Sequence, residues 1–323
     1  MEAHTVSQLK PEMTFSGDLL VRSVDRRTDK TGREYLDMTL CDATGEINAK
    51  KWNLENMDWQ PVSGQVINVD SVISSFNGRI QMKLNRIAPA SNPDMRMLVP
   101  SAPEPPEAML AEIEAAIDSF PTEDLRRLVR ELLRMPGDRL NYFPAAQRMH
   151  HAEYAGLLHH TTSMLKMAEH VCACYPFLNR ELLLAGVIVH DLCKTEEMQS
   201  NASGSVSDYT PDGILIGHLV RGVVWIERAA EKTGVSGEIV LLLQHMMLSH
   251  HGEPEFGSPK APMFPEAEAL HWIDSLDAKM NEMLTIQQRT PAGAFSERIA
   301  YLDDRRMYHP AFSSPVSPQT ADE

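Results

Sequence analysis

Cysteine and long apolar runs are scarce in this sequence. The four cysteines, Cys41, Cys172, Cys174 and Cys193, form no Cys-x-x-Cys pair and no regular framework, which excludes a disulfide-stapled secreted domain. No stretch of about 18 or more uncharged apolar residues is present, which excludes a membrane-spanning helix. Residues 1–10 lack the apolar centre of a secretory signal. We therefore expect a cytoplasmic protein with reduced thiols and no membrane partner.

Positive charge is also in short supply, with 30 Lys and Arg against 45 Asp and Glu and a formal net charge of −15. Such an excess disfavours contact with nucleic acid. Its distribution is uneven, however, since residues 1–90 hold 11 basic and 12 acidic side chains, whereas the remainder holds 19 and 33. An acidic region can still act on phosphates when divalent cations bind in it. The composition therefore neither establishes nor excludes an RNA partner.

Short alternating runs separated by turns occupy the N-terminal part of the chain. They predict five strands, at residues 14–24, 35–41, 46–52, 66–74 and 79–87. Asn77-Gly78, between the last two strands, is a strong signal for a hairpin. The pattern, with a short connection between the third and fourth strands, favours a five-stranded OB β-barrel over residues 1–88. A small barrel of the SH3 type is the alternative.

Proline then interrupts the pattern, and residues 89–107 are expected to form an extended, semi-rigid linker. Beyond it, apolar residues recur at spacings of three and four, as in Met109, Ile113 and Ile117. This period predicts an all-α helical bundle over residues 108–306. The polar residues 307–323 contain three further prolines and are expected to form a disordered tail.

Histidine, by contrast, is abundant, and ten of the 13 histidines lie between His150 and His251. Imidazole binds Mn, Fe, Co, Ni and Zn, and carboxylates complete such sites. A lone histidine on an apolar helix is usually a packed or surface residue. An ordered set in helical contexts favours a metal site instead, and the candidate ligands are His160, His190, Asp191, His218, His250, His251 and Asp274.

The contexts of the remaining histidines indicate other roles. His245 is expected to flank the site, and His150 and His151 are candidates for contact with substrate. Four more are expected to be structural: His4, His170, His271 and His309.

His160, the His190-Asp191 pair and Asp274 resemble the H…HD…D signature of HD-domain phosphohydrolases. The closer resemblance is to the YhaM-type 3′-to-5′ exoribonucleases, which couple an N-terminal OB fold to an HD domain. It covers about residues 10–305 in matching order. It is carried by stretches such as HHAEYAGLLHHTTSML (150–165), LNRELLLAGVIVHDLCKTEE (178–197) and HHGEPEFGSP (250–259).

The resemblance implies a two-metal phosphodiesterase in which Asp191 bridges the two ions. One ion would take His160, His190, Asp191 and Asp274; the other would take Asp191, His218, His250 and His251. It also implies Mn²⁺, and mixed imidazole and carboxylate ligation agrees with Mn²⁺ or with Fe, Co or Ni, because Mg²⁺ prefers oxygen.

Asp191 and Lys194 are the predicted catalytic residues, with Lys194 stabilising charge on a phosphate oxygen. A solvated lysine at a helix end is the alternative for Lys194. Two residues depart from the family pattern: His159 stands where members usually have Glu, and Cys193 stands where they usually have Gly. Both departures bear on the preference for a particular metal.

Single-stranded nucleic acid is held by aromatic platforms interleaved with cations. The barrel segment offers such residues: Arg33, Tyr35, Lys50, Lys51, Trp52, Phe76, Arg79 and Lys83. An aromatic residue in a small barrel more often packs in the core. Trp52, flanked by Lys50 and Lys51, is expected to be the most exposed of the three.

Three functions compete at this point. The first is a 3′-to-5′ exoribonuclease that degrades single-stranded RNA to nucleoside 5′-monophosphates, with single-stranded DNA as a possible second substrate. The second is an HD phosphodiesterase or nucleotidase for a small nucleotide, which has no use for a strand-holding barrel. The third is a non-catalytic RNA-binding protein, which a complete set of ligands disfavours. The apolar residues at 125–133 suit either a core or the subunit contacts of a homo-oligomer.

Overall fold

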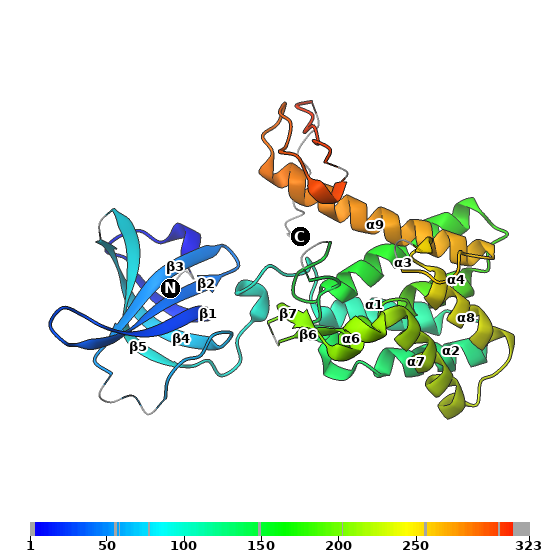
Figure 1. Ribbon diagram of the computed structural model, residues 1–323, viewed down its shortest axis with the longest axis horizontal. Helices are drawn as coiled ribbons and strands as arrows, with labels where there is room; N and C mark the ends of the chain where they lie inside the picture. Colours follow the sequence, from blue (N-terminus) through cyan, green and yellow to red (C-terminus); the bar gives the residue numbers. More distant parts are fainter. Residues whose placement is uncertain are drawn as a thin grey trace.

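The computed structural model describes residues 4–54, 57, 59–76, 78–147, 150–201, 203–254, 257–302 and 304–312. A β-barrel lies at one end of an elongated molecule and a helical domain lies at the other, joined by a single connecting segment (Figure 1). Within the described residues, no helix has the length and apolar character needed to cross a membrane. This arrangement confirms the expected fold class of an N-terminal barrel followed by a helical bundle.

The barrel contains five strands, and its closure follows the order β1-β2-β3-β5-β4. The strands are β1 (Thr14–Thr28), β2 (Glu34–Asp42), β3 (Gly45–Trp52), β4 (Val66–Phe76) and β5 (Arg79–Pro89), preceded by the 3-10 helix η1 (Val6–Gln8). Neighbouring strands are antiparallel except for β3 and β5, which pair in parallel. Five strands closed in this order form an OB barrel, so the SH3-type alternative is excluded.

The strands form because apolar residues alternate along them. In β2, for example, Leu36, Met38 and Leu40 are almost fully buried, and the residues between them point outward. A bulge between Val21 and Ser23 bends β1, which pairs with β4 along its first half and with β2 along its second half. Asn77, in the predicted hairpin turn, lies outside the described residues.

The connecting segment is anchored to both domains rather than free. It contains the 3-10 helix η2 (Met95–Met97), and Leu98 packs into a small cluster with Leu20 and Cys41 of the barrel. Four residues later, Ala102 is buried in the core of the helical domain. The expected extended linker is therefore pinned at both ends, because its apolar residues have partners on each side.

The helical domain packs its elements around one core that includes residues from most of its helices. The helices are α1 (Pro106–Asp118), α2 (Glu123–Arg134), η3 (Gly137–Asn141), α3 (Gly156–Cys174), α4 (Arg180–Val189), α5 (Lys194–Glu197), α6 (Pro211–Leu215), α7 (Gly217–Thr233), α8 (Glu238–Ser249), α9 (Pro265–Arg289) and η5 (Ala300–Leu302). Leu125, Leu128 and Leu132 of α2 are buried in this core, which assigns the 125–133 stripe to packing rather than to subunit contacts.

Two features of the C-terminal half differ from the sequence prediction. A short hairpin, β6 (Met198–Ser200) and β7 (Val206–Tyr209), interrupts the expected all-α region. Residues 307–312, expected to belong to a disordered tail, are described and ordered. The backbone of His309 exchanges hydrogen bonds with Gly293 and Ala294, which explains the order. Residues 313–323 lie outside the described residues.

Candidate functional site

Four helix ends and the middle of α9 bring the candidate ligands together in the interior of the helical domain. His160 lies in the second turn of α3, and His190 and Asp191 follow the last residue of α4. Every residue from Leu182 to Val189 of α4 is buried, so this helix delivers the pair directly into the core. His218 lies in the first turn of α7, His250 and His251 follow α8, and Asp274 lies on α9.

Four ligand atoms converge on one side of Asp191. The Nε2 atom of His160 lies 3.3 Å from Nε2 of His190, 3.3 Å from Oδ1 of Asp274 and 3.8 Å from Oδ2 of Asp191. Nε2 of His190 lies 3.3 Å from the same Oδ2. Separations of this size are those of neighbouring ligands around a single ion.

A second group faces the other oxygen of the same carboxylate. Oδ1 of Asp191 lies 3.5 Å from Nε2 of His218 and 3.8 Å from Nε2 of His250. His251 joins His218 and His250 in a cluster whose ligand atoms all lie within 4.8 Å of one another. Each oxygen of Asp191 therefore belongs to a different set of histidines.

The orientation of each buried imidazole is fixed through its other nitrogen. Nδ1 of His190 and Nδ1 of His250 face the backbone oxygens of Val187 and Met247, at 2.8 and 2.9 Å. Two carboxylates hold the other rings: Nδ1 of His160 lies 2.7 Å from Asp277, and Nδ1 of His218 lies 2.8 Å from Glu197. Because an oxygen acceptor fixes the proton on Nδ1, Nε2 presents its lone pair to the interior of the site.

The buried atoms themselves indicate that a cation fits here. Within the described residues, Oδ1 of Asp191, Nε2 of His218 and Nε2 of His250 are buried and have no hydrogen-bond partner. Three convergent polar atoms without partners are costly in a protein interior. Two imidazoles and a carboxylate are together a donor set for a divalent transition metal, which would satisfy all three.

Charge at the site is balanced by Lys194, whose Nζ lies 2.6 Å from Oδ2 of Asp191. Burial acts to raise the pKa of the Asp191 carboxyl, but Lys194 and the surrounding histidines hold that pKa well below its usual range. Burial also lowers the pKa of His250, so its ring is neutral and able to bind a metal. Lys194 therefore points into the site, as the predicted catalytic role requires, and not into solvent as a helix-end lysine would.

Two carboxylates that support the ligands were missed at the level of sequence. Asp277 lies one helical turn after Asp274 on α9, and Glu197 ends α5. The spacing of three residues between Asp274 and Asp277 places both on one face of α9. That spacing was the available signal for Asp277, whereas Glu197 had no comparable marker.

Several of the other histidines have contacts outside the two ligand groups. Nδ1 of His271 faces the backbone oxygen of His250, so His271 supports a candidate ligand. His245 accepts a hydrogen bond from the backbone nitrogen of Met263 at 3.0 Å, and its ring packs against Phe264. His150 is largely buried, and its ring lies 5.6 Å from the ring of His160. His170 is exposed on α3.

The outer face of the barrel gathers most of the predicted nucleic-acid-binding residues. Tyr35 and Trp52 are cross-strand neighbours whose rings stack with centroids 4.4 Å apart. Nζ of Lys50 lies 5.4 Å from the Tyr35 ring and 5.9 Å from the Phe76 ring. We define the aromatic-basic face as Arg33, Tyr35, Lys50, Trp52, Phe76 and Lys83, where Lys83 pairs with Lys50 across β3 and β5 and the guanidinium of Arg33 lies 5.8 Å from the Trp52 ring.

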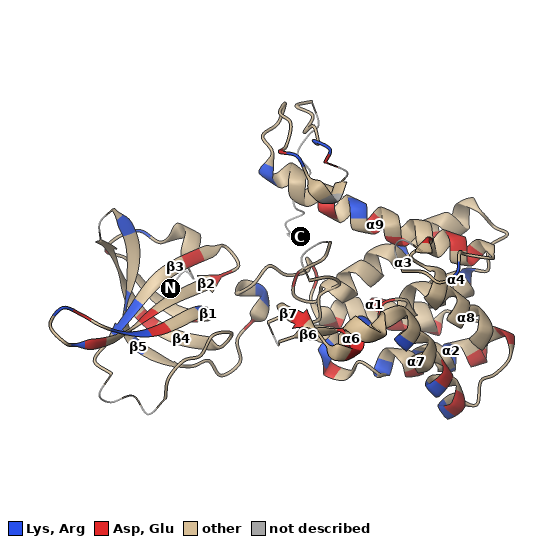
Figure 2. Cartoon of the chain, in the orientation of Figure 1, with Lys and Arg blue, Asp and Glu red and all other residues tan. Residues whose placement is uncertain are grey.

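The remaining barrel predictions are placed differently. Lys51 points to the other side of β3, where its Nζ donates to the backbone oxygen of Asn85, because side chains alternate along a strand. Arg79 lies opposite Phe76 at the end of the β4–β5 hairpin, at the margin of the face. Phe76 is 63% exposed and Trp52 is only partly exposed, so the expectation that Trp52 is the most exposed aromatic residue is wrong; stacking on Tyr35 covers it. Charges of both signs occur on the barrel strands (Figure 2).

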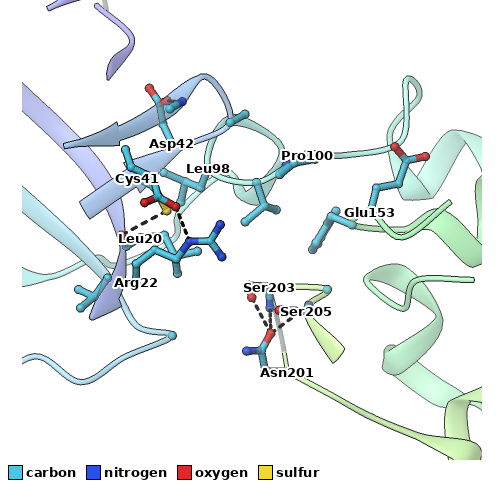
Figure 3. A pocket seen from close by; sticks show the side chains of 18 of the residues that line it. Leu20, Arg22, Cys41, Asp42, Leu98, Pro100, Glu153, Asn201, Ser203 and Ser205 are labelled. Atoms are coloured by element: carbon cyan, nitrogen blue, oxygen red, sulfur yellow. Dashed lines mark hydrogen bonds and ion pairs between the residues drawn. The ribbon is translucent and has the colours of Figure 1, made fainter. Parts of the chain in front are cut away.

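A pocket of about 560 Å³ lies where the two domains meet. Figure 3 shows Arg22 and Asp42 on the barrel side, Pro100 of the connecting segment, and Glu153 and Ser203 of the helical domain around it. On the helical side, Asn201 is held by hydrogen bonds from the hydroxyl and backbone nitrogen of Ser203. The pocket marks the junction between the barrel and the domain that contains the ligands.

The helical domain matches the family model described as HD domain, over residues 157–279. The whole chain is also similar to curated proteins named 3′-5′ exoribonuclease YhaM. The protein of that name from Bacillus pumilus is 40% identical over 91% of this chain and 94% of its own length. The corresponding protein of Bacillus subtilis is 38% identical over 91% and 94%.

The chain belongs to the YhaM family. A relative in Listeria monocytogenes, 39% identical over 91% of this chain and 94% of its own length, has the same name. Membership accounts for the order of the two domains, because the alignments extend across both of them. It also places the candidate metal centre within the segment that matches the HD domain.

Solved structures similar to the chain align with about a quarter of it. The second OB-fold domain of replication protein A from Methanococcus maripaludis is 19% identical, with a TM-score of 0.24, over 28% of this chain and 97% of that one. The OB domain of Ta0387 from Thermoplasma acidophilum is 13% identical, with a TM-score of 0.22, over 28% and 87%. The OB assignment of the barrel rests on its strand order and closure.

Proposed function

We propose that this chain is a metal-dependent 3′-to-5′ exoribonuclease that shortens single-stranded RNA and releases nucleoside 5′-monophosphates. The observation that carries the proposal is the arrangement around Asp191, whose two oxygens face two separate groups of histidines. The activity that the relatives are named for, at about 40% identity along nearly the whole chain, supports the same reaction. The free thiols of its four cysteines support the cytoplasm as its location.

Two groups of residues would hold the cations. His160, His190, Asp191 and Asp274 would hold one, and Asp191, His218, His250 and His251 would hold the other. When bound, such cations neutralise charge on a phosphodiester and acidify a water molecule. The mixed imidazole and carboxylate donors support Mn²⁺, with Fe, Co or Ni as other suitable ions, over Mg²⁺.

The two remaining roles at the site belong to the side chains of Asp191 and Lys194. Asp191 would keep the two groups of ligands in fixed positions relative to each other. Its side chain is buried, with Lys194 at one oxygen and His218 at the other. Its carboxylate also keeps Lys194 charged: burial disfavours the ammonium, but the interaction with Asp191 raises the pKa of Lys194. A charged Lys194 inside the site would stabilise a phosphate oxygen as its charge develops.

The aromatic-basic face of the barrel would hold the strand. Stacking on Phe76 and the Tyr35–Trp52 pair does not depend on base identity, and Lys50 and Lys83 add attraction for phosphates. These contacts suit single-stranded RNA and also single-stranded DNA, because none of them reads a 2′-hydroxyl.

A labelled substrate tests the proposal directly. A single-stranded RNA labelled at its 5′ end is incubated with metal-stripped protein, with or without Mn²⁺, and resolved on a sequencing gel. We expect a Mn²⁺-dependent ladder that shortens from the 3′ end. His190→Ala and Asp191→Ala should abolish it while RNA binding persists, and His170→Ala should behave as wild type because His170 is exposed and lies outside the site.

Intact RNA in a protein that still binds manganese would refute the exonuclease. It would favour the phosphodiesterase or nucleotidase acting on a small nucleotide. Turnover that survives in the Asp191→Ala variant would refute the assigned centre instead.

A further inference from the structure

A separate cluster of metal-binding side chains lies beside the HD centre. The loop before α3 contributes His151 and Glu153, and the first turn of α3 contributes His159. Nδ1 of His159 lies 3.1 Å from Nδ1 of His151 and 2.7 Å from Oε1 of Glu153. Nδ1 of His151 lies 3.6 Å from the same Oε1. Three potential donor atoms therefore face one another, and none of them belongs to the ligand sets around Asp191.

The proton on the His151 ring is located by its other neighbour. Nε2 of His151 lies 2.7 Å from Oδ2 of Asp277, and a carboxylate can only accept a hydrogen bond. In the neutral ring the proton is therefore on Nε2, and Nδ1 presents a lone pair to the cluster. The amide nitrogen of Asn281, 3.3 Å from Nδ1, is a donor, which agrees with that assignment.

The spacing of these atoms matches the ligands of one small cation. Donors about 2.0–2.2 Å from a tetrahedral ion lie roughly 3.3 Å from one another. The three observed separations, 2.7, 3.1 and 3.6 Å, bracket this value. Two imidazoles and one carboxylate are a three-ligand set that leaves a fourth position for water.

We propose that His151, Glu153 and His159 form a third cation site, suited to Zn²⁺ and distinct from the centre around Asp191. His151 is 3% exposed, and Glu153 and His159 are partly buried, so the set is held within the fold rather than on a solvated surface. The competing account is a hydrogen-bonded network in which His159 simply donates to Glu153. That account requires no ion, and the two accounts are separated by metal content.

The cluster lies where the connecting segment meets the helical domain. Tyr154, within the same loop, donates from its backbone nitrogen to the oxygen of Pro100 and accepts from the nitrogen of Ala102. Glu153 is one of the residues that line the pocket at the junction of the domains (Figure 3). A cation bound here would fasten the loop that carries the connecting segment to the start of α3.

The loop before α3 has a strained backbone conformation that a bound cation would help to hold. His151 and Ala155 have φ values of 48° and 58°, in the left-handed region that residues other than glycine seldom adopt. A cation ligated by His151 and His159 would hold both ends of this loop. The site therefore has a structural role at the junction, and it contacts the HD centre through Asp277, which also binds His160.

The test is the zinc content of purified full-length chains after equilibrium dialysis against buffered Zn²⁺, measured by plasma mass spectrometry. We expect His159→Ala to retain one ion fewer per chain than wild type. Glu153→Gln, which preserves side-chain shape, should lose the same ion. His170→Ala, a histidine removed from an exposed position of the same helix, should match wild type.

Repeating the comparison in an Asp191→Ala background keeps this site separate from the HD centre. Adding His159→Ala to that background should again remove one ion per chain, whatever the first two sites retain. Equal zinc content in wild type, His159→Ala and Glu153→Gln would overturn the proposal in favour of the hydrogen-bonded network. Loss of more than one ion from folded His159→Ala would overturn the independence of the site.

Discussion

At the scale of single residues, Asp191 and Asp277 have different roles at the candidate metal centre. Asp191 is buried, and its two oxygens face separate groups of histidines. Asp277 is not one of the candidate metal ligands around Asp191. Its Oδ2 lies 2.7 Å from Nε2 of His151 and 2.7 Å from Nδ1 of His160. A carboxylate that fixes the ring of a ligand histidine tunes metal affinity without touching the metal.

We predict that Asp277→Asn weakens Mn²⁺ binding by about 10- to 100-fold, because an amide cannot accept hydrogen bonds from both rings with equal strength. Titration of the metal-free protein followed by calorimetry measures the change. Asp208→Asn, at an exposed position of β7, is the matched control. An unchanged affinity for Mn²⁺ in Asp277→Asn would contradict the orienting role of Asp277.

Cys193 offers a second prediction at this scale, since it lies beside Asp191 and Lys194. Burial raises the pKa of the Cys193 thiol, so the reactive thiolate is scarce near neutral pH. We expect iodoacetamide at pH 8 to modify the exposed Cys174 and to leave Cys193 unmodified until the protein is unfolded in guanidinium. Mass spectrometry of native and unfolded samples checks this; rapid labelling of native Cys193 would contradict it.

The candidate ligands could be selected from the sequence because they are histidines and aspartates at ordered positions in helical contexts. Their supporting carboxylates could not be selected in the same way. Glu197 and Glu153 are two of 45 acidic residues, and only the fold brings them to His218 and His159. Phe76 and Trp52 were both identified, but their relative exposure depends on the stacking of Trp52 on Tyr35.

At the scale of elements, the start of α3 is tightly packed against the loop that precedes it. Gly156 is its first residue, and a Cβ atom there would overlap the backbone oxygen of His151. The loop that holds His151 and Glu153 therefore packs directly on the helix that holds His159 and His160. Backbone atoms cannot withdraw from such a contact as a flexible side chain can.

We predict that Gly156→Ala lowers the free energy of unfolding by about 1–3 kcal/mol, because the loop must shift away from α3. Urea denaturation followed by circular dichroism provides the measurement. Gly45→Ala is the control, since a Cβ there meets only Val6 at 3.7 Å, an ordinary contact. A Gly156→Ala protein as stable as Gly45→Ala would show that the loop adjusts freely.

The strands of the barrel were predicted to within a few residues because alternation is a local signal. The β6–β7 hairpin was not predicted. Its strands contain three and four residues, which is too short for a pattern of alternating apolar and polar residues to be recognised. The bulge in β1 also has no local marker, because it is set by pairing with two different strands.

At the scale of the whole molecule, the proposed strand-binding face and the candidate metal ligands lie in different domains. The aromatic-basic face lies on the barrel and the metal ligands lie in the helical domain (Figure 1). Changes to the barrel face should therefore alter affinity for long strands and leave hydrolysis of very short ones unaffected.

We predict that Trp52→Ala combined with Lys50→Glu weakens binding of a long single-stranded RNA by at least about 1–3 kcal/mol, through lost stacking and charge. Fluorescence anisotropy measures binding, and cleavage of a dinucleotide measures hydrolysis. Lys10→Glu, an equal charge change at an exposed position outside the face, controls for net charge. Equal losses on long and short substrates would show that the barrel does not hold the strand.

We further predict that chelation of divalent metal lowers the thermal midpoint of the helical domain, because a ligand that binds only the folded state stabilises it. Differential scanning calorimetry with EDTA, and then with excess Mn²⁺, measures the loss and its recovery. Asp191→Ala should show no such recovery by Mn²⁺ at the HD centre. A midpoint in wild type that is indifferent to metal would argue against a centre that holds ions in the folded state.

The anchoring of the connecting segment has a consequence for the length of the products. Leu98 is packed against the barrel and Ala102 against the helical core, so the chain between them is too short and too well held to let the domains drift apart. If the barrel holds the RNA as proposed, a strand whose 3′ end is being trimmed must span the distance between the barrel face and the metal centre. A strand shorter than this distance would contact only one of the two sites, and its digestion should slow. We therefore expect the anchored junction to determine the length of the fragment that remains.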